Sequence, residues 1–417
     1  MLLRFEVANH RSVLEPVELS MIAVDEDRPA ARGFELLTEQ VLAIAGIYGP
    51  NASGKSNVVE ALAWLSAAVR NSLRAWDKII PREPFKFGDG PNAPSAYEVE
   101  MVVGGVRFSY RVEVDDAEVL FEGLYSYPER RRRVLFEREG LEISFRRGLG
   151  SLAGTRELLT PATLALSAAM RFDEPEVEPF ARQLAGIQDH GHQRAANWNR
   201  SEMPGAQSQL TLTLFDDQDI SKGQALALLR FADLGIDDVR LVESDGRDAW
   251  LSALGETRRP QLMHRVRGQG LLFELSEESA GTQTWFELIG PTLTALSAGR
   301  VLLVDEIDAS LHPRLSARLL ELFQDPETNP HGAQLIFTTH DTSLLNFLNR
   351  DEVWLTEKNA GGATTLTALA EYGGDKVRRS LNLERAYLQG RFGAVPELDQ
   401  FKLRRALGLM PGDRADA

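Results

Sequence analysis

Residues 49–56 read GPNASGKS and match the pattern G-x-x-x-x-G-K-[S/T] at every fixed position. The preceding run VLAIAGIYG (41–49) is short, apolar and ended by glycine, as is typical of a buried strand. After it, apolar residues recur at helical spacing between Asn57 and Val69. A strand, a glycine loop and a helix in this order predict a phosphate-binding loop rather than a chance glycine turn.

The residue types of this loop suit the binding of a nucleoside triphosphate. Two glycines let backbone N–H groups turn inward around phosphate oxygens, and the N-terminus of the following helix adds a partial positive charge. We expect Lys55 to reach the β- and γ-phosphates and Ser56 to ligate Mg²⁺. The predicted contacts to ATP are Gly49, Pro50, Asn51, Ala52, Ser53, Gly54, Lys55, Ser56 and Asn57.

A second motif, LLVDEIDASLHP (302–313), follows the pattern of a buried strand that ends in two acids. The apolar run from Val301 to Val304 would deliver Asp305 and Glu306 to the strand end. Asp305 is predicted to hold Mg²⁺, through water, and Glu306 to be the general base that orients the attacking water. Adjacent acids are common on surfaces, but here they follow an apolar strand in a chain that has a phosphate loop.

The run FTTHD (337–341) places a histidine at the end of a further strand. A lone histidine is more often an ordinary surface or core residue. Its position after the Asp-Glu strand favours a functional role, so His340 is predicted to hydrogen-bond the γ-phosphate or the attacking water.

The rest of the chain divides by its hydrophobic pattern. Residues 85–145 alternate with period two between glycine-rich turns, which predicts an antiparallel β-meander, and residues 157–240 are mostly helical in pattern. Strands then alternate with helices, which predicts an α/β core split into two parts. The expected units are the first core part (1–75), a β-rich lobe (76–155), a mostly helical insertion (156–264) and the second core part with a C-terminal extension (265–417).

Composition limits the remaining possibilities. The chain has no cysteine, which excludes disulfides and thiolate chemistry, and it has no apolar run long enough to span a membrane. The start lacks a signal-peptide pattern, so a cytoplasmic location is expected. A net charge of −15 repels nucleic acid unless a local basic face exists. The densest basic run, Arg130 to Arg133, is interpreted as a solvated hairpin tip rather than a phosphate patch.

Three smaller clusters are candidate sites, and the first two favour a structural interpretation. The two histidines of DHGHQR (189–194) could share a metal ion, but the sequence indicates no further ligands to complete the site. The acids of FDDQD (215–219) could bind Mg²⁺ for nuclease chemistry, but they suit a solvated loop better. The basic run KVRRS (376–380) could touch an anionic partner or form a helix face. The residues concerned in the first two are Asp189, His190, His192, Asp216, Asp217 and Asp219.

The order GPNASGKS, ESAGTQ, LLVDEIDASLHP, TTHD resembles the ABC-type ATPase core shared by SMC and double-strand-break-repair ATPases. The resemblance implies that Ser279 and Gly281 form the signature that contacts the γ-phosphate held by the other subunit of a head-to-tail dimer. Thr282 and Gln283 replace the commoner second glycine. It also implies that residues 309–312 form a loop across the dimer interface. An ordinary helix N-cap at Ser279 is compatible with that role.

The chain further resembles bacterial AAA-type, ABC-like ATPases of overcoming-lysogenization-type and two-gene phage-defence systems. The resemblance rests on NHRS (9–12), where His10 replaces the usual aromatic residue, and on FADLGIDDVRL (231–241), HDTSLL (340–345), RDEVWLTEK (350–358) and YLQGRFGAVP (387–396). It implies nucleotide contacts by Arg11 and Ser12. Gln183 and Gln188 lie where a glutamine loop is expected, and no motif selects either.

The sequence therefore predicts an ATPase that uses ATP and Mg²⁺, dimerises on ATP and regulates a separately encoded effector such as a nuclease, in anti-phage defence. Nucleic acid stays open as a partner, and no membrane contact is expected. The alternatives are an ATP-assembled scaffold with slow turnover and a DNA-repair-type ATPase. A repair ATPase would need long heptad arms between the core halves, which the sequence lacks, and too few residues follow His340 for a Toprim nuclease domain. A nuclease within this chain and a transporter subunit fit the motifs less well.

Overall fold

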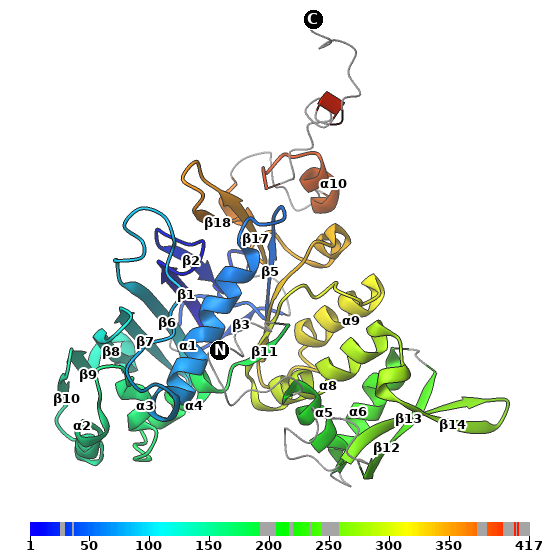
Figure 1. Cartoon of the computed structure of the whole chain (residues 1–417), viewed down its shortest axis with the longest axis horizontal. Helices are drawn as coiled ribbons and strands as arrows, with labels where there is room; N and C mark the ends of the chain where they lie inside the picture. Colours follow the sequence, from blue (N-terminus) through cyan, green and yellow to red (C-terminus); the bar gives the residue numbers. More distant parts are fainter. Residues whose placement is uncertain are drawn as a thin grey trace, which may run out of the picture.

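The fold is described from a computed structural model, in which two large sheets lie on either side of one long helix (Figure 1). The structure describes residues 1–25, 30–35, 37–191, 206–216, 220–232, 235–243, 258–372 and 382–394, with residues 404, 405 and 407. The alternation of strands and helices predicted from the sequence is confirmed. No helix among these residues is long and apolar enough to cross a membrane.

The first sheet carries the phosphate loop. It has six strands in the order β11-β15-β16-β5-β17-β18, all parallel except β18, which is antiparallel to β17. Because the parallel strands end at one edge, residues that follow β5, β15 and β16 are brought together there. The strands are β5 (Ile44–Tyr48), β11 (Gln188–His190), β15 (Val301–Val304), β16 (Gln334–Thr338), β17 (Val353–Lys358) and β18 (Thr364–Ala368).

The second sheet is antiparallel and has the order β10-β9-β8-β7-β6-β1-β2. The β-meander expected at 85–145 supplies five of these strands, but β1 pairs with β6, with Val7 opposite Tyr97. The sheet therefore spans the domain boundary expected at residue 75, because β1 needs a neighbour for its backbone hydrogen bonds. The strands are β1 (Leu2–Ala8), β2 (Val17–Ser20), β6 (Ser95–Val103), β7 (Val106–Val114), β8 (Val119–Tyr127), β9 (Arg133–Glu139) and β10 (Glu142–Phe145).

Helix α1 (Lys55–Ala75) contacts both sheets, through β1 on one side and β16 on the other. It is buried on nearly every face, which explains its apolar composition. Two short helices pack against it and a third packs against one of these two, and a small two-stranded sheet lies close to the chain start in sequence. These are α2 (Thr155–Leu158), α3 (Ala165–Ala169), α4 (Glu178–Ala185), β3 (Arg32–Gly33) and β4 (Gln40–Val41).

The other face of the first sheet is covered by a second group of elements (Figure 1). Residues 236–243 and 258–266 form strands rather than the helical segment expected there, because Ile236, Val239 and Leu262 bury one face against Trp285 and its neighbours. The elements are α5 (Ala206–Asp216), α6 (Ile220–Phe231), β12 (Ile236–Glu243), β13 (Arg258–Val266), β14 (Gln269–Glu274), α8 (Ala280–Ala298), α9 (Pro313–Gln324) and α10 (Leu383–Leu388). Short 3₁₀ turns are η1 (Pro128–Arg130), η2 (Gly150–Gly154), η4 (Leu275–Glu277), η5 (Thr342–Phe347) and η6 (Leu369–Glu371).

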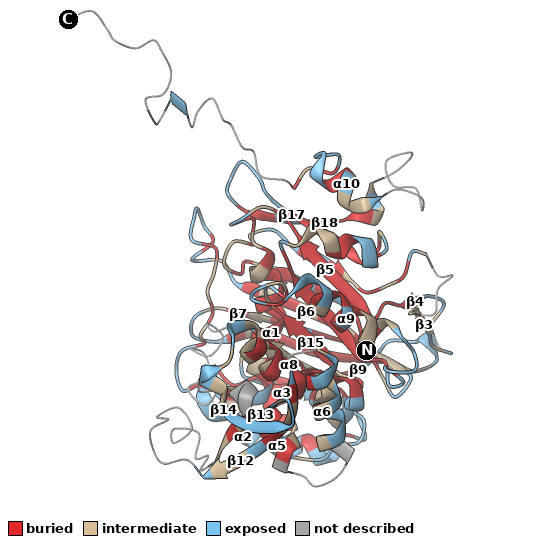
Figure 2. Ribbon diagram, turned by 90° about the vertical axis from the view of Figure 1, so that its right-hand side faces the viewer, coloured by how far each residue is buried: buried red, intermediate tan, exposed pale blue. Residues whose placement is uncertain are grey.

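Four of the parallel strands, β5, β15, β16 and β17, contribute side chains to two hydrophobic cores. Along β15, Val301 and Leu303 join the core with α1, whereas Leu302 and Val304 join the core with α8 and α9. This is the alternation expected of a strand buried on both faces. Figure 2 shows the strands of this sheet buried in the middle of the molecule and β14 exposed at its margin. The central sheet is thus a rigid base for the residues at its carboxyl edge.

Candidate functional site

The phosphate loop joins β5 to α1 as predicted. Gly54 has a left-handed backbone (φ 104°), and a Cβ there would lie 2.1 Å from Thr364 Oγ1. Only glycine therefore fits between α1 and β18. The Lys55 ammonium donates to the carbonyls of Gly49 (2.9 Å) and Pro50 (3.3 Å), so the lysine lies back over its own loop.

Lys55 faces several acids. Burial lowers its pKa below the usual value, since the charged ammonium loses water, and the nearby carboxylates of Glu306, Asp305 and Asp308 partly oppose this shift. The sequence predicted that the first two would meet Lys55. Asp308 was missed, although it stands three residues after Asp305 in the same motif.

Thr338, at the end of β16, joins the two predicted acids. Its hydroxyl donates to Asp305 Oδ1 (2.5 Å) and accepts from the backbone N–H of Glu306 (2.8 Å). Glu306 has a left-handed backbone (φ 52°), which costs a non-glycine residue about 1 kcal/mol or more. Its side chain is exposed and lines the cavity described below, as a base that must meet water would.

His340 follows β16 and is positioned by Asp308. The backbone N–H of His340 donates to both oxygens of that carboxylate (3.2 and 3.4 Å), and the hydroxyl of Thr339 donates to Oδ1 (2.6 Å). Asp308 therefore ties the turn after β15 to the turn after β16, so Glu306 and His340 reach one cavity.

A cavity of about 830 Å³ lies at this edge of the sheet. Its predicted members are Asn51, Ala52, Gly54, Lys55, Ser56, Asn57, Glu306 and His340, together with Ser12 and Ala309, which the resemblance implied. Two further members, Asp308 and Lys358, were not predicted. The residues predicted from the sequence that do not line it are Arg11, Gly49, Pro50, Ser53, Ser279, Gly281 and Asp305.

Arg11 does not line the cavity. Its guanidinium pairs with Glu60 of α1 (2.5 Å) and with Glu83 (3.0 Å). Asn9, two residues earlier, also has a structural role. Its side-chain amide donates to the carbonyls of Gly90 and Ala93, both at 2.8 Å. In this structure Arg11 holds the chain in place, and its neighbour Ser12 is the residue that reaches the cavity.

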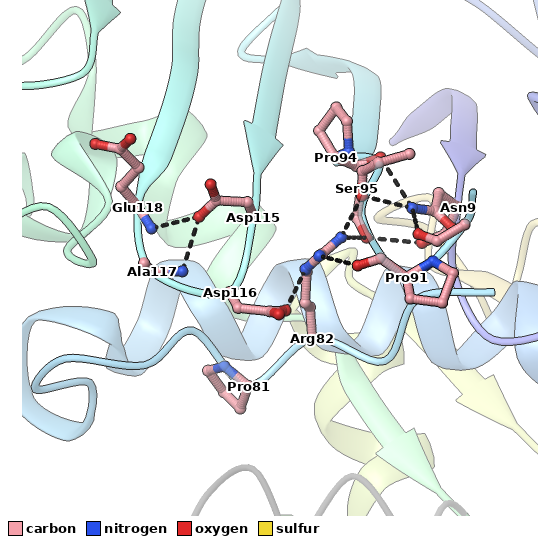
Figure 3. A network of polar contacts seen from close by, with 12 residues as sticks. Asn9, Pro81, Arg82, Pro91, Pro94, Ser95, Asp115, Asp116, Ala117 and Glu118 are labelled. Atoms are coloured by element: carbon pink, nitrogen blue, oxygen red, sulfur yellow. Dashed lines mark hydrogen bonds and ion pairs between the residues drawn. The ribbon is translucent and has the colours of Figure 1, made fainter. Parts of the chain in front are cut away.

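The loop that Asn9 binds is also held by Arg82 (Figure 3). The Arg82 guanidinium donates to Asp116 (2.7 Å) and to the carbonyls of Ala93 (2.6 Å) and Pro91 (3.0 Å). Since Arg82 is buried, these bonds fix the segment that carries Glu83, the partner of Arg11. Residues 9–11 are thus part of a rigid support behind the cavity.

Ser279 caps α8, and its side chain accepts a hydrogen bond from the backbone N–H of Thr282 (3.1 Å). It is exposed and does not line the cavity of its own chain. Thr282, which replaces a glycine of the signature pattern, is buried and bonds to the Ser279 hydroxyl (2.9 Å). The helix N-terminus is therefore presented outward, with its first turn ordered by Thr282.

Neither Gln183 nor Gln188, the two candidates for a glutamine loop, lines the cavity. Gln183 donates to the carbonyl of Gly299 (2.8 Å) and lines a second cavity of about 420 Å³, and Gln188 donates to that of Gly186 (3.0 Å). The strand β11 nevertheless lies beside β15, and the carbonyl of His190 accepts from the backbone N–H of Asp305 (2.9 Å).

Within the described ranges, no group of three His, Asp or Glu side chains could hold a metal by itself. Magnesium usually keeps several waters and uses one or two protein oxygens with substrate phosphates, so Ser56 and Asp305 fit it. Asp189 and His190 stand on β11. His192, Asp217, Asp219 and the run 376–380 lie outside the described residues. Arg130 to Arg133 are all exposed: the first three lie in the turn between β8 and β9, and Arg133 begins β9, so the run lies at a hairpin turn as expected.

Solved structures similar to this chain include SMC head domains, all with low identity. One, titled "Crystal structure of the SmcHead bound to the C-winged helix domain of ScpA", has 15% identity and a TM-score of 0.45 and covers 88% of this chain and 97% of that chain. The SMC head domain from Thermotoga maritima has 13% identity and a TM-score of 0.38, over 88% and 98%. The Smc head domain bound to the C-terminal domain of ScpA derived from Pyrococcus furiosus has 13% and 0.42, over 89% and 97%.

A protein-family model covers most of the site. Among curated proteins, none matches this sequence. The family model described as "AAA domain, putative AbiEii toxin, Type IV TA system" matches residues 44–346. This range includes the phosphate loop, the Asp-Glu strand and His340 and exceeds half of the chain, so the protein belongs to this AAA-domain family.

Proposed function

We propose that the protein is an ATPase that binds ATP with Mg²⁺ in the cavity at the carboxyl edge of the parallel sheet. The observation that carries the proposal is the meeting of Lys55 with Glu306, Asp308 and His340 around one cavity. A glycine turn before a helix would not need acids from one further strand and a histidine from another. Family membership supports the same conclusion.

The contacts suggest a role for each group. Lys55 now bonds to the carbonyls of Gly49 and Pro50 and would exchange them for β- and γ-phosphate oxygens when ATP binds. Water attacks the γ-phosphorus, the bond from that phosphorus to the ADP oxygen breaks, and Glu306 takes a proton from the water. His340 would hydrogen-bond a γ-phosphate oxygen. Mg²⁺, held by Ser56 and by Asp305 through water, would neutralise charge on the phosphates.

Ser279 and Gly281 supply the second half of the proposed site from a partner protomer. Ser279 is exposed at the N-terminus of a 19-residue helix and does not line the cavity of its own chain. Helix N-termini favour anions, so this end suits a γ-phosphate held elsewhere. A head-to-tail pair would place each Ser279 against the ATP of the other protomer, with residues 309–312 between them.

We further propose that opening and closing of this dimer regulates a separately encoded effector, such as a nuclease, or a nucleic-acid transaction in anti-phage defence. The family description, which refers to a "putative AbiEii toxin" of a toxin–antitoxin system, supports a role of this protein in defence. The net charge of −15 favours a protein partner over free nucleic acid. The alternative is a scaffold that assembles on ATP and turns it over slowly.

Steady-state phosphate release tests the enzymatic proposal. Glu306→Gln should lower the rate on the order of 10²-fold or more while ATP binding persists, because the base is lost and the shape is kept. Lys55→Ala should weaken ATP binding itself. Glu139→Gln, an exposed acid on β9, is the matched control and should keep the wild-type rate. Equal and very slow release by wild type and Glu306→Gln would instead support the scaffold.

Light scattering tests the shared site. Glu306→Gln should trap ATP and raise the dimer fraction, and adding Ser279→Arg should return it to the nucleotide-free value. Ser297→Arg, near the other end of the same helix and also exposed, should leave the dimer intact. A chain that stays monomeric with ATP, and shows no constitutive oligomer, would contradict the dimer.

A further inference from the structure

The cavity has a side that the hydrolytic groups do not use. Glu306, Asp308 and His340 follow β15 and β16, which lie on one side of the phosphate-loop strand β5. Lys358 ends β17, the neighbour of β5 on the opposite side, and it also lines the cavity. The cavity thus holds a second lysine that the chemistry above leaves without a role.

Lys358 stands beside the phosphate loop itself. Strand β17 runs parallel to β5 with Leu355 opposite Tyr48, so the residues that follow Leu355 run alongside the loop that follows Tyr48. Thr356 confirms this contact, since its hydroxyl bonds to that of Ser53 (2.6 Å). Lys358 follows two residues later in the same strand and therefore also lies beside the phosphate loop.

A neutral hydroxyl holds the Lys358 ammonium. Its Nζ donates to Thr364 Oγ1 (3.0 Å), and that hydroxyl donates to the carbonyl of Ser53 (2.7 Å). Among the described residues, no carboxylate forms an ion pair with Lys358. Partial burial lowers the pKa of Lys358, because its ammonium has lost some water. Lys358 is nevertheless an exposed residue, so its ammonium, which has a hydroxyl partner and no carboxylate partner among the described residues, is accessible to an anionic ligand.

The neighbours of Lys358 indicate which part of a nucleotide lies there. Ser12 bonds through its hydroxyl to Thr364 (2.7 Å) and accepts from the Asn57 side chain (2.5 Å), and Ser12 and Asn57 line the cavity with Lys358. Asn57 lies in the first turn of α1, past Lys55 and Ser56, which are assigned to the β- and γ-phosphates and to Mg²⁺. The next phosphate along the nucleotide is the α-phosphate.

We propose that Lys358 is a second phosphate-binding cation of this site, which leaves the Thr364 hydroxyl to bind the α-phosphate of the nucleotide, with Ser12 and Asn57 positioning that end. The inference rests on the proposed nucleotide site and adds a residue to it from β17. Because ATP and ADP share the α-phosphate, Lys358 contributes equally to the binding of both.

Titration of wild-type protein and variants with ATP and with ADP, in the presence of Mg²⁺, tests the assignment. Lys358→Met should weaken both nucleotides by the same factor, about 10-fold or more, as expected for one lost charge-assisted hydrogen bond. Lys358→Arg should retain part of the affinity, since it keeps the charge. Lys78→Met removes an exposed lysine after α1 and should bind both nucleotides as wild type does.

The other outcomes are distinct. Weaker binding of ATP alone would assign Lys358 to the γ-phosphate and overturn the inference, and so would unchanged binding of both nucleotides. Wild-type protein that binds neither nucleotide would overturn the proposed function itself. Circular dichroism of each variant separates lost binding from lost fold, and Lys358→Arg remains a test if Lys358→Met unfolds.

Discussion

A β-carbon built on Gly281 would lie 2.7 Å from the backbone carbonyl oxygen of Ser310. Real β-carbons essentially never approach an oxygen so closely, so the start of α8 can pack on the loop after β15 only with glycine at this position. Ser310 itself has a left-handed backbone (φ 65°). In the proposed dimer this contact connects the loop next to one active site with the signature that serves the other.

Gly281→Ala should therefore lower ATP turnover about 10-fold or more while ATP affinity of the single protomer stays near wild type. The added methyl group displaces α8 or the loop at Ser310, and neither lines the phosphate-loop side of the cavity. Phosphate release and ATP titration measure the two effects. Gly223→Ala, also within a helix but with no atom within 4 Å of the new carbon, should keep full activity and gain slightly in stability. Equal effects of the two changes would refute the steric explanation.

Thr338→Val should lower the hydrolysis rate about 10-fold to 100-fold. The change removes the hydroxyl that donates to Asp305 and accepts from the N–H of Glu306, and it leaves a partly buried N–H without this partner. Thr338→Ser keeps the hydroxyl and should retain most of the rate. The measurement is steady-state phosphate release at saturating ATP. If the valine variant were as active as the serine variant, the hydroxyl would have no role in positioning the acids.

Arg11→Met should destabilise the fold more than it weakens ATP binding. Glu60, which is nearly fully buried, would lose its ion pair with Arg11, at a cost of roughly 3–5 kcal/mol. Urea unfolding gives the stability and titration gives the ATP affinity. Arg4→Met removes a surface ion pair with Glu18 and should change stability by about 0.5 kcal/mol or less. A large loss of ATP affinity with unchanged stability would restore the nucleotide contact predicted from the sequence.

His10→Phe should reduce the loss of stability in acid. Burial, with a smaller contribution from the Arg11 charge, lowers the pKa of His10 from 6.5 to about 3. As pH falls below 6.5 the unfolded chain binds the proton first, so the stability that neutral His10 contributes is complete above that pH and is lost toward pH 3. Relative to the phenylalanine variant, wild type should lose about 2 kcal/mol between pH 7.5 and pH 5.

Urea unfolding of both proteins at the two pH values gives this difference. The substitution also removes the hydrogen bond between His10 and Tyr97 (2.9 Å), which changes the stability at pH 7.5. The stability of each protein at pH 5 is therefore expressed relative to its own value at pH 7.5. Parallel pH dependence of wild type and His10→Phe would show that His10 titrates normally in the folded chain.

The sequence by itself determined the edge of the sheet at which the candidate site lies. Three local patterns, the phosphate loop, the Asp-Glu pair and the histidine of FTTHD, each follow a short apolar strand, and parallel strands end at one edge of their sheet. Lys55, Glu306 and His340 could therefore be placed together without coordinates. Local periodicity suffices for such residues because their position depends only on the strand that each one follows.

Tertiary structure alone decided the partners of these residues. Thr338 and Asp308 join the turns after β15 and β16, and Lys358 meets the phosphate loop through pairing between strands more than three hundred residues apart. It also decided that Arg11 faces Glu60 while Ser12 faces the cavity. A side chain's role here depends on which distant segment packs against it, and the free energy of that packing is spread over two cores that no single motif encodes.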